Sequence, residues 1–138
     1  MFYNLLSATA LTLTLFSELG LALLTDSSSW ASIPQPVIGL VSQPLYSGWT
    51  TDSRFNGYST YIMAAYVQSI ESAGARVVPL IMGEAWSVTL DKINRLDGIF
   101  FPGGSGDYKD FGKQIFDTVK ILNDQGTFYP MWGTCLGF

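Results

Sequence analysis

Hydrophobic residues alternate along the chain between short continuous runs and stripes with helical spacing. Continuous apolar runs are typical of strands buried on both faces, and they occupy residues 37–41, 76–81, 98–101 and 128–132. Between these runs, apolar side chains recur every three or four residues over 58–73 and 108–123, which predicts amphipathic helices, and a shorter helix is expected near 87–94. This alternation predicts an α/β domain built on a parallel sheet.

Glycines mark the ends of the predicted helices and one strand-end loop. Gly74 and Gly126 follow two of the helices, at positions where the left-handed conformation commonly ends a helix. The run at 98–101 leads directly into the glycine-rich segment 102–106. Ligands of open α/β sheets bind beyond the carboxyl ends of the strands, so the loops after residues 41, 101 and 132 are the expected site.

The N-terminal residues form an apolar leader. Serine and threonine interrupt it, Glu18 lies inside it, and Gly20-Leu21-Ala22 offers a cleavage site with small residues, although no Lys or Arg precedes the apolar part. These features favour a secretory signal peptide at residues 1–22 over an uncleaved anchor or a buried helix. Residues 23–35, rich in serine, are then a flexible lead-in to one folded domain at 36–138.

Composition narrows the chemistry of this domain. The 138 residues fit one domain, and a net charge of -4 argues against binding to nucleic acid. With one cysteine and no histidine, the chain has neither a disulfide framework of its own nor a Cys/His zinc site, so no metal is expected. Chemistry in these residues must use the single thiol, carboxylates or the backbone.

The single cysteine lies in the segment Gly133-Thr134-Cys135-Leu136-Gly137, here called the elbow. The elbow follows an apolar strand and is the thiol counterpart of the G-x-S-x-G turn, which exposes a nucleophile. The N–H of Leu136 is then placed to bind an oxyanion, and a helix starting after Cys135 would favour the thiolate. A buried structural cysteine is the alternative interpretation.

The pair Gly103-Gly104 is a candidate for the second oxyanion donor, because glycine lets the backbone approach a substrate carbonyl closely. A simple tight turn is the alternative. A thiol nucleophile normally also needs an imidazole that takes its proton. The 138 residues contain no histidine, so a complete Cys-His pair is not encoded in them.

Three segments carry a resemblance to a known family. They are residues 71–79 (ESAGARVVP), 98–105 (GIFFPGGS) and 132–138 (WGTCLGF). Together they strongly resemble gamma-glutamyl hydrolase, of the glutamine amidotransferase-like superfamily, over about residues 36–138. The resemblance implies a flavodoxin-like parallel sheet with helices on both faces. It also implies a cysteine peptidase that cleaves folylpoly-γ-glutamates through a thioester, without metal or organic cofactor, in the extracellular space, lysosome or vacuole.

The resemblance also implies roles for individual residues. Cys135 matches the nucleophile, and the backbone amides of Gly104 and Leu136 match the oxyanion donors. The expected substrate-contacting residues are Tyr61, Gly103 and Ser105. For Tyr61, packing on a helix is an equally good interpretation. The family's histidine lies well downstream of the elbow, so the chain resembles an N-terminal half whose domain is truncated after the elbow.

Two other functions stay open. A glutamine amidotransferase domain shares the elbow, and so does a non-enzymatic thiol protein or inactive fragment. The expected partner is a small-molecule poly-γ-glutamyl substrate, for which Arg54 and Lys109 are candidate cationic contacts, unless they are only solvated surface charges. Neither nucleic acid nor, after signal cleavage, stable membrane insertion is expected, and a homodimer of the full-length protein is a further expectation.

Overall fold

The computed structural model describes residues 34–138 of the chain. The predicted signal peptide at 1–22 and nearly all of the lead-in at 23–35 lie outside the described residues. The main sheet consists of four parallel strands in the order β4-β1-β5-β6. Their bounds are β1 (Val37–Val41), β4 (Arg76–Leu80), β5 (Gly98–Phe101) and β6 (Met131–Gly133). The first strand lies inside the sheet and later strands extend it on either side, which is the flavodoxin-like order.

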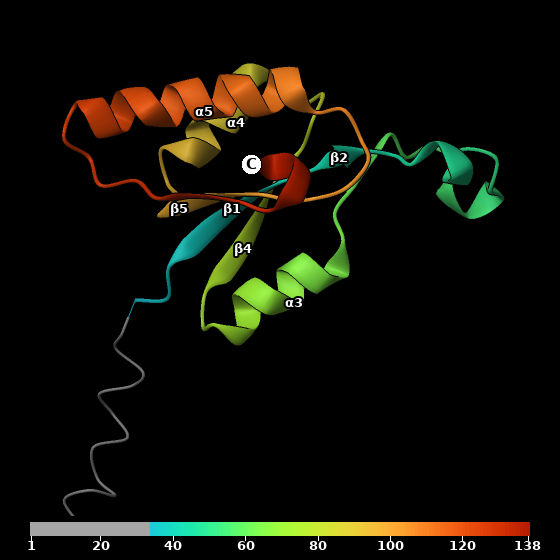
Figure 1. Ribbon diagram of the computed structural model, residues 1–138, viewed down its shortest axis with the longest axis horizontal. Helices are drawn as coiled ribbons and strands as arrows, with labels where there is room; N and C mark the ends of the chain where they lie inside the picture. The colour runs from blue at the N-terminus through green and yellow to red at the C-terminus, as the bar shows by residue number, and fades with distance from the viewer. Residues whose placement is uncertain (1–33) are drawn as a thin grey trace, which may run out of the picture. The chain divides into compact units, whose positions relative to one another are not determined.

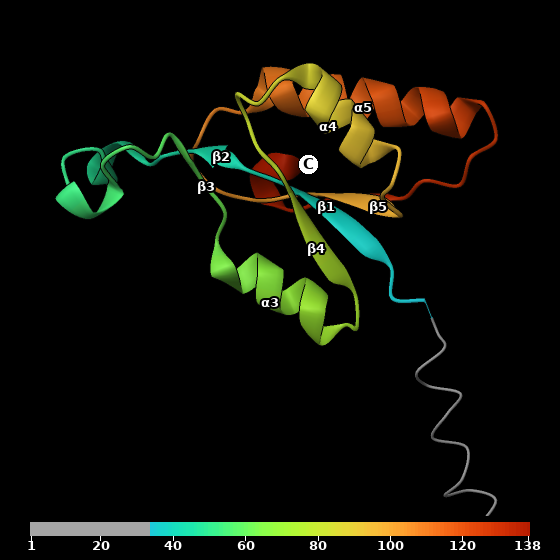
Figure 2. The same ribbon diagram turned by 180° about the vertical axis from the view of Figure 1, so that it is seen from behind.

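Three helices connect these strands and cover both faces of the sheet. They are α3 (Ala64–Ser72), α4 (Trp86–Ile93) and α5 (Lys109–Asp124). Helices α4 and α5 lie together on one face and α3 lies on the other, as both views show (Figures 1 and 2). The predicted α/β fold, with a parallel sheet and helices on both faces, is therefore confirmed.

Burial of the central strands and of the inner stripes of the helices creates the core. On the face of α4 and α5, the side chains of Ile93, Ile115 and Val119 are fully buried against Val41 and Leu80 of the sheet. The spacing of Ile115 and Val119 along α5 places both on one side of the helix. The periodic stripe seen in the sequence is thus the contact surface with the sheet.

The first predicted helix is shorter than expected at its start. It was predicted over 58–73, but α3 begins at Ala64. The residues before it include the short strand β3 (Thr60–Tyr61), which pairs antiparallel with β2 (Gln43–Pro44). The connection from β2 to β3 contains two 3-10 turns, η1 (Ser47–Trp49) and η2 (Ser53–Phe55). Backbone pairing with β2 therefore replaces the first helical turns, although the apolar spacing continues through them.

The last strand also differs from its predicted position. The apolar run at 128–132 predicted a strand there, whereas β6 spans Met131–Gly133. Phe128 is exposed, while the ring of Tyr129 is buried and its hydroxyl donates to the carbonyl of Ile93 at 2.9 Å. The first part of the run is thus a loop that packs the ring of Tyr129 into the core. Strand β6 starts two residues after Tyr129, at Met131.

Candidate active site

The loops that follow β1, β5 and β6 meet at the carboxyl ends of these strands. Gln43, after β1, donates through Nε2 to the carbonyl of Gly103 at 2.7 Å. The N–H of Thr134 donates to the carbonyl of Phe101 at 3.1 Å and so ties the elbow to the end of β5. Strands β1 and β5 lie where the strand order reverses, which is the usual ligand site of such sheets.

Cys135 has an unusual backbone conformation. Its φ is 53°, and it is the only residue other than glycine with positive φ in the described part of the chain. A left-handed conformation costs a non-glycine residue about 1–2 kcal/mol, and such strain often occurs at functional sites. The side chain is exposed, so Cys135 is not the buried structural cysteine of the alternative interpretation.

Backbone hydrogen bonds hold this conformation in place. Gly137 donates to the carbonyl of Thr134 at 2.9 Å, and Phe138 donates to the carbonyl of Cys135 at 3.1 Å. These bonds form the 3-10 turn η3 (Cys135–Gly137). Of the helix expected after Cys135, residues 135–138 contain this single turn.

Two glycines allow the elbow to lie close to the end of β5. A Cβ atom at Gly103 would lie 2.8 Å from Cβ of Cys135, closer than two such atoms can approach. A Cβ atom at Gly137 would overlap the backbone carbonyl of Phe101. Glycine at both positions is therefore a requirement of packing, and it brings the glycine loop (residues 102–104) next to the cysteine.

Within the described residues, the two backbone amides predicted as oxyanion donors make no hydrogen bonds. Gly103 uses its own N–H in a hydrogen bond to Oη of Tyr66 at 3.0 Å. The N–H groups of Gly104 and Leu136 have no hydrogen-bond partner among residues 34–138. Both flank the close contact between the glycine loop and the elbow, so either is available to a ligand oxygen.

The three predicted substrate-contacting residues differ in their surroundings. Tyr61 donates through its hydroxyl to Oε1 of Gln43 at 3.2 Å, and its ring packs edge-on against Trp49 with the ring centroids 5.2 Å apart. Gly103 is buried and uses both its N–H and its carbonyl in hydrogen bonds. Ser105 is exposed. Gln43 thus connects Tyr61 with Gly103, whereas no contact brings Ser105 into this group.

Three polar side chains around the glycine loop were not recognised in the sequence. They are Gln43, Tyr66 and Tyr108. Tyr108 is buried and donates through its hydroxyl to the carbonyl of Pro102 at 2.6 Å. Burial, together with the smaller effects of the neighbouring Tyr66 and Cys135, raises the pKa of Tyr108 to about 12. The hydroxyl of Tyr108 therefore keeps its proton and stays a donor over the whole physiological pH range.

A signal for Gln43 was present in the sequence. It lies two residues after the buried strand β1, in the loop at the carboxyl ends of the strands where a ligand site was expected. Tyr66, by contrast, belongs to the apolar stripe of its helix, and packing alone explained its position.

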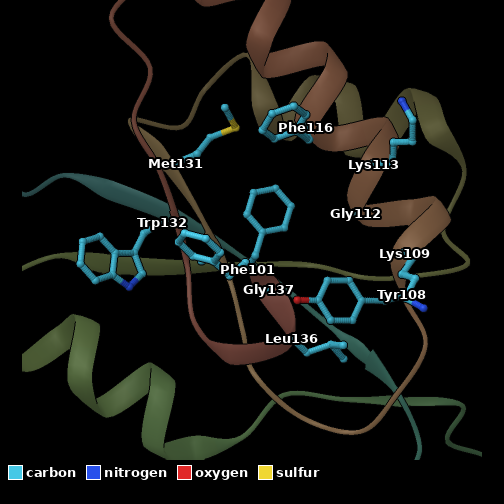
Figure 3. A pocket seen from close by; sticks show the side chains of 12 residues that line it. Phe101, Tyr108, Lys109, Gly112, Lys113, Phe116, Met131, Trp132, Leu136 and Gly137 are labelled. Carbon is cyan, nitrogen blue, oxygen red and sulfur yellow. The ribbon is translucent and has the colours of Figure 1, made fainter.

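A cavity of about 440 Å³ opens beside the elbow, between α5 and β6 (Figure 3). Aromatic and aliphatic side chains line most of it, and two lysines of α5 lie at its border. Its lining includes Phe101, Phe116, Met131, Leu136, Lys109 and Lys113. A second cavity of about 560 Å³ lies between α3 and strands β5 and β6. Cys135 lines neither cavity, although its neighbours Leu136 and Thr134 do.

The candidate cationic residues lie in different places. Lys109 borders the first cavity. Arg54 lies in η2 and is paired with Asp52, with Nη2 and Oδ2 2.6 Å apart. Within residues 34–138, no group of three or more His, Cys, Asp or Glu side chains is placed to hold a metal ion. In the same part of the chain, the helices are too short or too polar to cross a membrane.

Comparison with known proteins gives one family and several relatives. A family profile described as Peptidase C26 matches residues 36–138. The chain is 41% identical to gamma-glutamyl hydrolase 1 of Arabidopsis thaliana, over 75% of this chain and 30% of the relative. It is 39% identical to the gamma-glutamyl hydrolase of Rattus norvegicus, over 75% of this chain and 32% of the relative. It is also 39% identical to that of Homo sapiens, over 75% of this chain and 33% of the relative. The chain thus spans about a third of the length of these curated relatives.

Proposed function

The chain belongs to the peptidase C26 family, and we propose that it provides the nucleophile and the oxyanion site of a cysteine-type γ-glutamyl hydrolase. The observation that carries the proposal is the exposed thiol of Cys135 on a strained turn, beside two backbone amides without partners among the described residues. The names of the similar proteins support the substrate bond, a γ-glutamyl amide.

The proposed reaction begins with attack of the Cys135 thiolate on the γ-amide carbonyl. A bond forms between sulfur and carbon, and the carbonyl oxygen becomes an anion that accepts hydrogen bonds from the N–H groups of Gly104 and Leu136. The carbon–nitrogen bond then breaks, and the leaving amine takes a proton. Water hydrolyses the resulting thioester to a free γ-carboxylate and restores the thiol.

The proton that reaches the leaving amine needs a donor beyond these side chains. An imidazole usually takes the proton of a thiol nucleophile and returns it to the leaving group. Since residues 1–138 include no histidine, we assign this role to an imidazole from another part of the active protein. The relatives, which are about three times as long as the matched segment, have room for such a residue.

The substrate we propose is a folylpoly-γ-glutamate, which carries one carboxylate for each glutamyl unit. Lys109 and Lys113 border the cavity next to Leu136 and would attract these carboxylates. Arg54 is a weaker candidate because its guanidinium already pairs with Asp52. We also propose secretion or delivery to a lysosome or vacuole, on the basis of the apolar leader. Cleavage after Ala22 in secreted material would support this route, and an intact leader would contradict it.

The function is tested by incubating the protein with a folyl-oligo-γ-glutamate and measuring released glutamate. We expect no release by the 138 residues alone, because they lack an imidazole. Addition of the C-terminal remainder of a peptidase C26 relative should restore release, and Cys135→Ala should abolish it. Release of glutamate by the Cys135→Ala variant under these conditions would contradict the proposal.

The same assay separates the two alternatives. A glutamine amidotransferase would release ammonia from free glutamine and leave the oligomer intact. A non-enzymatic thiol protein would be alkylated at Cys135 but would turn over neither substrate, whatever is added.

A further inference from the structure

We propose that Gln43 is a positioning residue, whose buried amide orients the Gly104 N–H toward the oxyanion. The inference rests on the proposed function, because it concerns how the oxyanion site of that reaction is held. It assigns a role to a side chain that makes no direct contact with the reacting atoms. Gln43 lies 60 residues before Gly103 in the chain, yet the two are joined by a hydrogen bond.

The amide of Gln43 is buried and its polar atoms are all in use. The residue is 2% exposed. Nε2 donates to the carbonyl of Gly103 at 2.7 Å. It also makes a longer and weaker hydrogen bond to the carbonyl of Pro102 at 3.5 Å. Oε1 accepts the hydroxyl of Tyr61 at 3.2 Å. Two carbonyls on one side and a hydroxyl donor on the other define which way the amide faces.

The planarity of the peptide bond converts this contact into an orientation. The carbonyl of Gly103 and the N–H of Gly104 belong to one trans peptide group, so they point in opposite directions. Holding the carbonyl oxygen at Gln43 therefore directs the Gly104 N–H away from Gln43. The preceding peptide is fixed as well, since the Gly103 N–H donates to Oη of Tyr66 at 3.0 Å.

Glycine at positions 103 and 104 makes such a constraint necessary. A glycine pair has access to many backbone conformations, including those with positive φ, and rotation of the peptide between them would turn the N–H away from the oxyanion. The fit with Gln43 is close, because a Cβ atom at Gly104 would overlap Oε1 of the Gln43 amide. The loop thus combines backbone freedom with a side chain that selects one orientation.

The test compares two electrophiles on the whole 138-residue chain at alkaline pH, where thiolate forms without an imidazole. A γ-glutamyl chloromethyl ketone develops a negative carbonyl oxygen as sulfur adds to it, before the thioether forms and chloride leaves. Iodoacetamide alkylates the Cys135 thiolate by direct displacement: sulfur bonds to its CH₂ carbon, iodide leaves, and no oxyanion develops. The ratio of the two second-order rate constants therefore measures the oxyanion site and cancels changes in the thiol itself.

Gln43→Glu keeps the shape of the side chain and removes the shorter of the two donors to the Gly103 carbonyl, leaving Oη of Tyr66 at 3.4 Å. We expect it to lower the ketone rate by about tenfold or more, since removing one oxyanion donor costs about 10²–10³ in kcat, and to change the iodoacetamide rate less than twofold. The matched control is Gln68→Glu, the same change at an exposed position of α3, which should leave both rates unchanged. Gln43→Asn, which keeps an uncharged amide but shortens its reach, provides the measurement if Gln43→Glu does not fold.

The rate ratio of the Gln43 variants and the amide signal of Gly104 decide whether Gln43 has the positioning role. An unchanged rate ratio in both Gln43 variants, or a parallel fall of both rates, would overturn the positioning role. A selective fall of the ketone rate, together with a shift of the Gly104 amide in a ¹H–¹⁵N spectrum, would establish it. If the unmodified chain reacts no faster with the γ-glutamyl ketone than with chloroacetone, a ketone without the glutamyl group, the proposed function fails, whatever the variants do.

Discussion

The glycine loop and the elbow meet at one site but are held in different ways. Buried side chains from other elements fix the glycine loop, with Gln43 and Tyr108 donating to its carbonyls. The elbow is fixed by backbone hydrogen bonds and by the close approach of Gly137 to Phe101. The glycine loop depends on side chains outside it, one of them 60 residues away in the chain, whereas the elbow depends on the local absence of side chains.

This difference explains why strain is present in only one of the two loops. The elbow holds the left-handed Cys135 in place with contacts of the backbone itself. In the glycine loop, no residue with positive φ is found, and the orientation comes from the amide and hydroxyl donors around it. Substitutions should therefore act on the elbow through steric overlap and on the glycine loop through lost hydrogen bonds.

The largest effect is expected for Gly137→Ala, which tests the steric half of the comparison. The added Cβ would overlap the carbonyl of Phe101, so we expect a loss of about 3 kcal/mol in the free energy of unfolding, at the upper end for overpacking. Gly126→Ala provides the comparison without steric overlap, since no atom lies near the new Cβ and the only cost is the strain of its φ of 93°. It should cost only about 1–2 kcal/mol. Equal losses in urea unfolding would show that steric overlap does not control the elbow.

A smaller effect is expected for Tyr108→Phe, which tests whether side-chain donors hold the glycine loop. The change leaves the buried carbonyl of Pro102 without its short hydrogen bond and should cost about 1–2 kcal/mol in the free energy of unfolding. Tyr58→Phe, on an exposed ring, is the control and should be neutral. Stability unchanged by Tyr108→Phe would mean that the glycine loop does not need this donor.

The strain at the elbow is measured by comparing Cys135→Gly with Cys135→Ala. Both remove the thiol, but only glycine adopts a φ of 53° without penalty. The glycine variant should be more stable than the alanine variant by about 1 kcal/mol in urea unfolding. Equal stability would indicate that the turn relaxes when the thiol is absent.

The effect of the two buried tyrosines on the free energy of unfolding is absent at neutral pH and appears in alkali. Burial raises the pKa of Tyr108 to about 12 and also raises that of Tyr129, whereas an unfolded tyrosine has a pKa of about 10. The native state then binds more protons than the unfolded state above about pH 10, so the free energy of unfolding falls as pH rises from there toward 12. Urea unfolding followed by circular dichroism at several pH values in this range should show a shallower fall of the free energy of unfolding in Tyr108→Phe than in the unmodified chain.

Most of the fold was predictable because the buried residues of its strands and helices are apolar and follow the spacing of those elements in the sequence. Strands β1, β4 and β5 and the cores of α3, α4 and α5 correspond to the predicted runs and stripes. The pairing of β2 with β3 was not predictable in this way, since two residues per strand are too few to show a period of two. Likewise, Tyr129 extended an apolar run although its ring packs into the core from a loop.

The candidate site was predictable only where local sequence defines it. The glycines and Cys135 of the elbow form a contiguous motif, and its backbone strain follows from the turn that the motif forms. Gln43 belongs to no motif, because its partners lie near residues 61 and 103 and come together only in the folded sheet. The roles of Cys135, Gly104 and Leu136 in catalysis stay predictions until the rates are measured.

The carbonyl of Phe101 links the elbow to the glycine loop. It accepts the N–H of Thr134 and lies against Gly137, while Phe101 itself is joined covalently to Pro102 at the start of the glycine loop. Both loops are therefore anchored to one peptide unit at the tip of β5. A displacement of that tip would therefore move Cys135 and Gly104 in the same direction and limit the change in the distance between them.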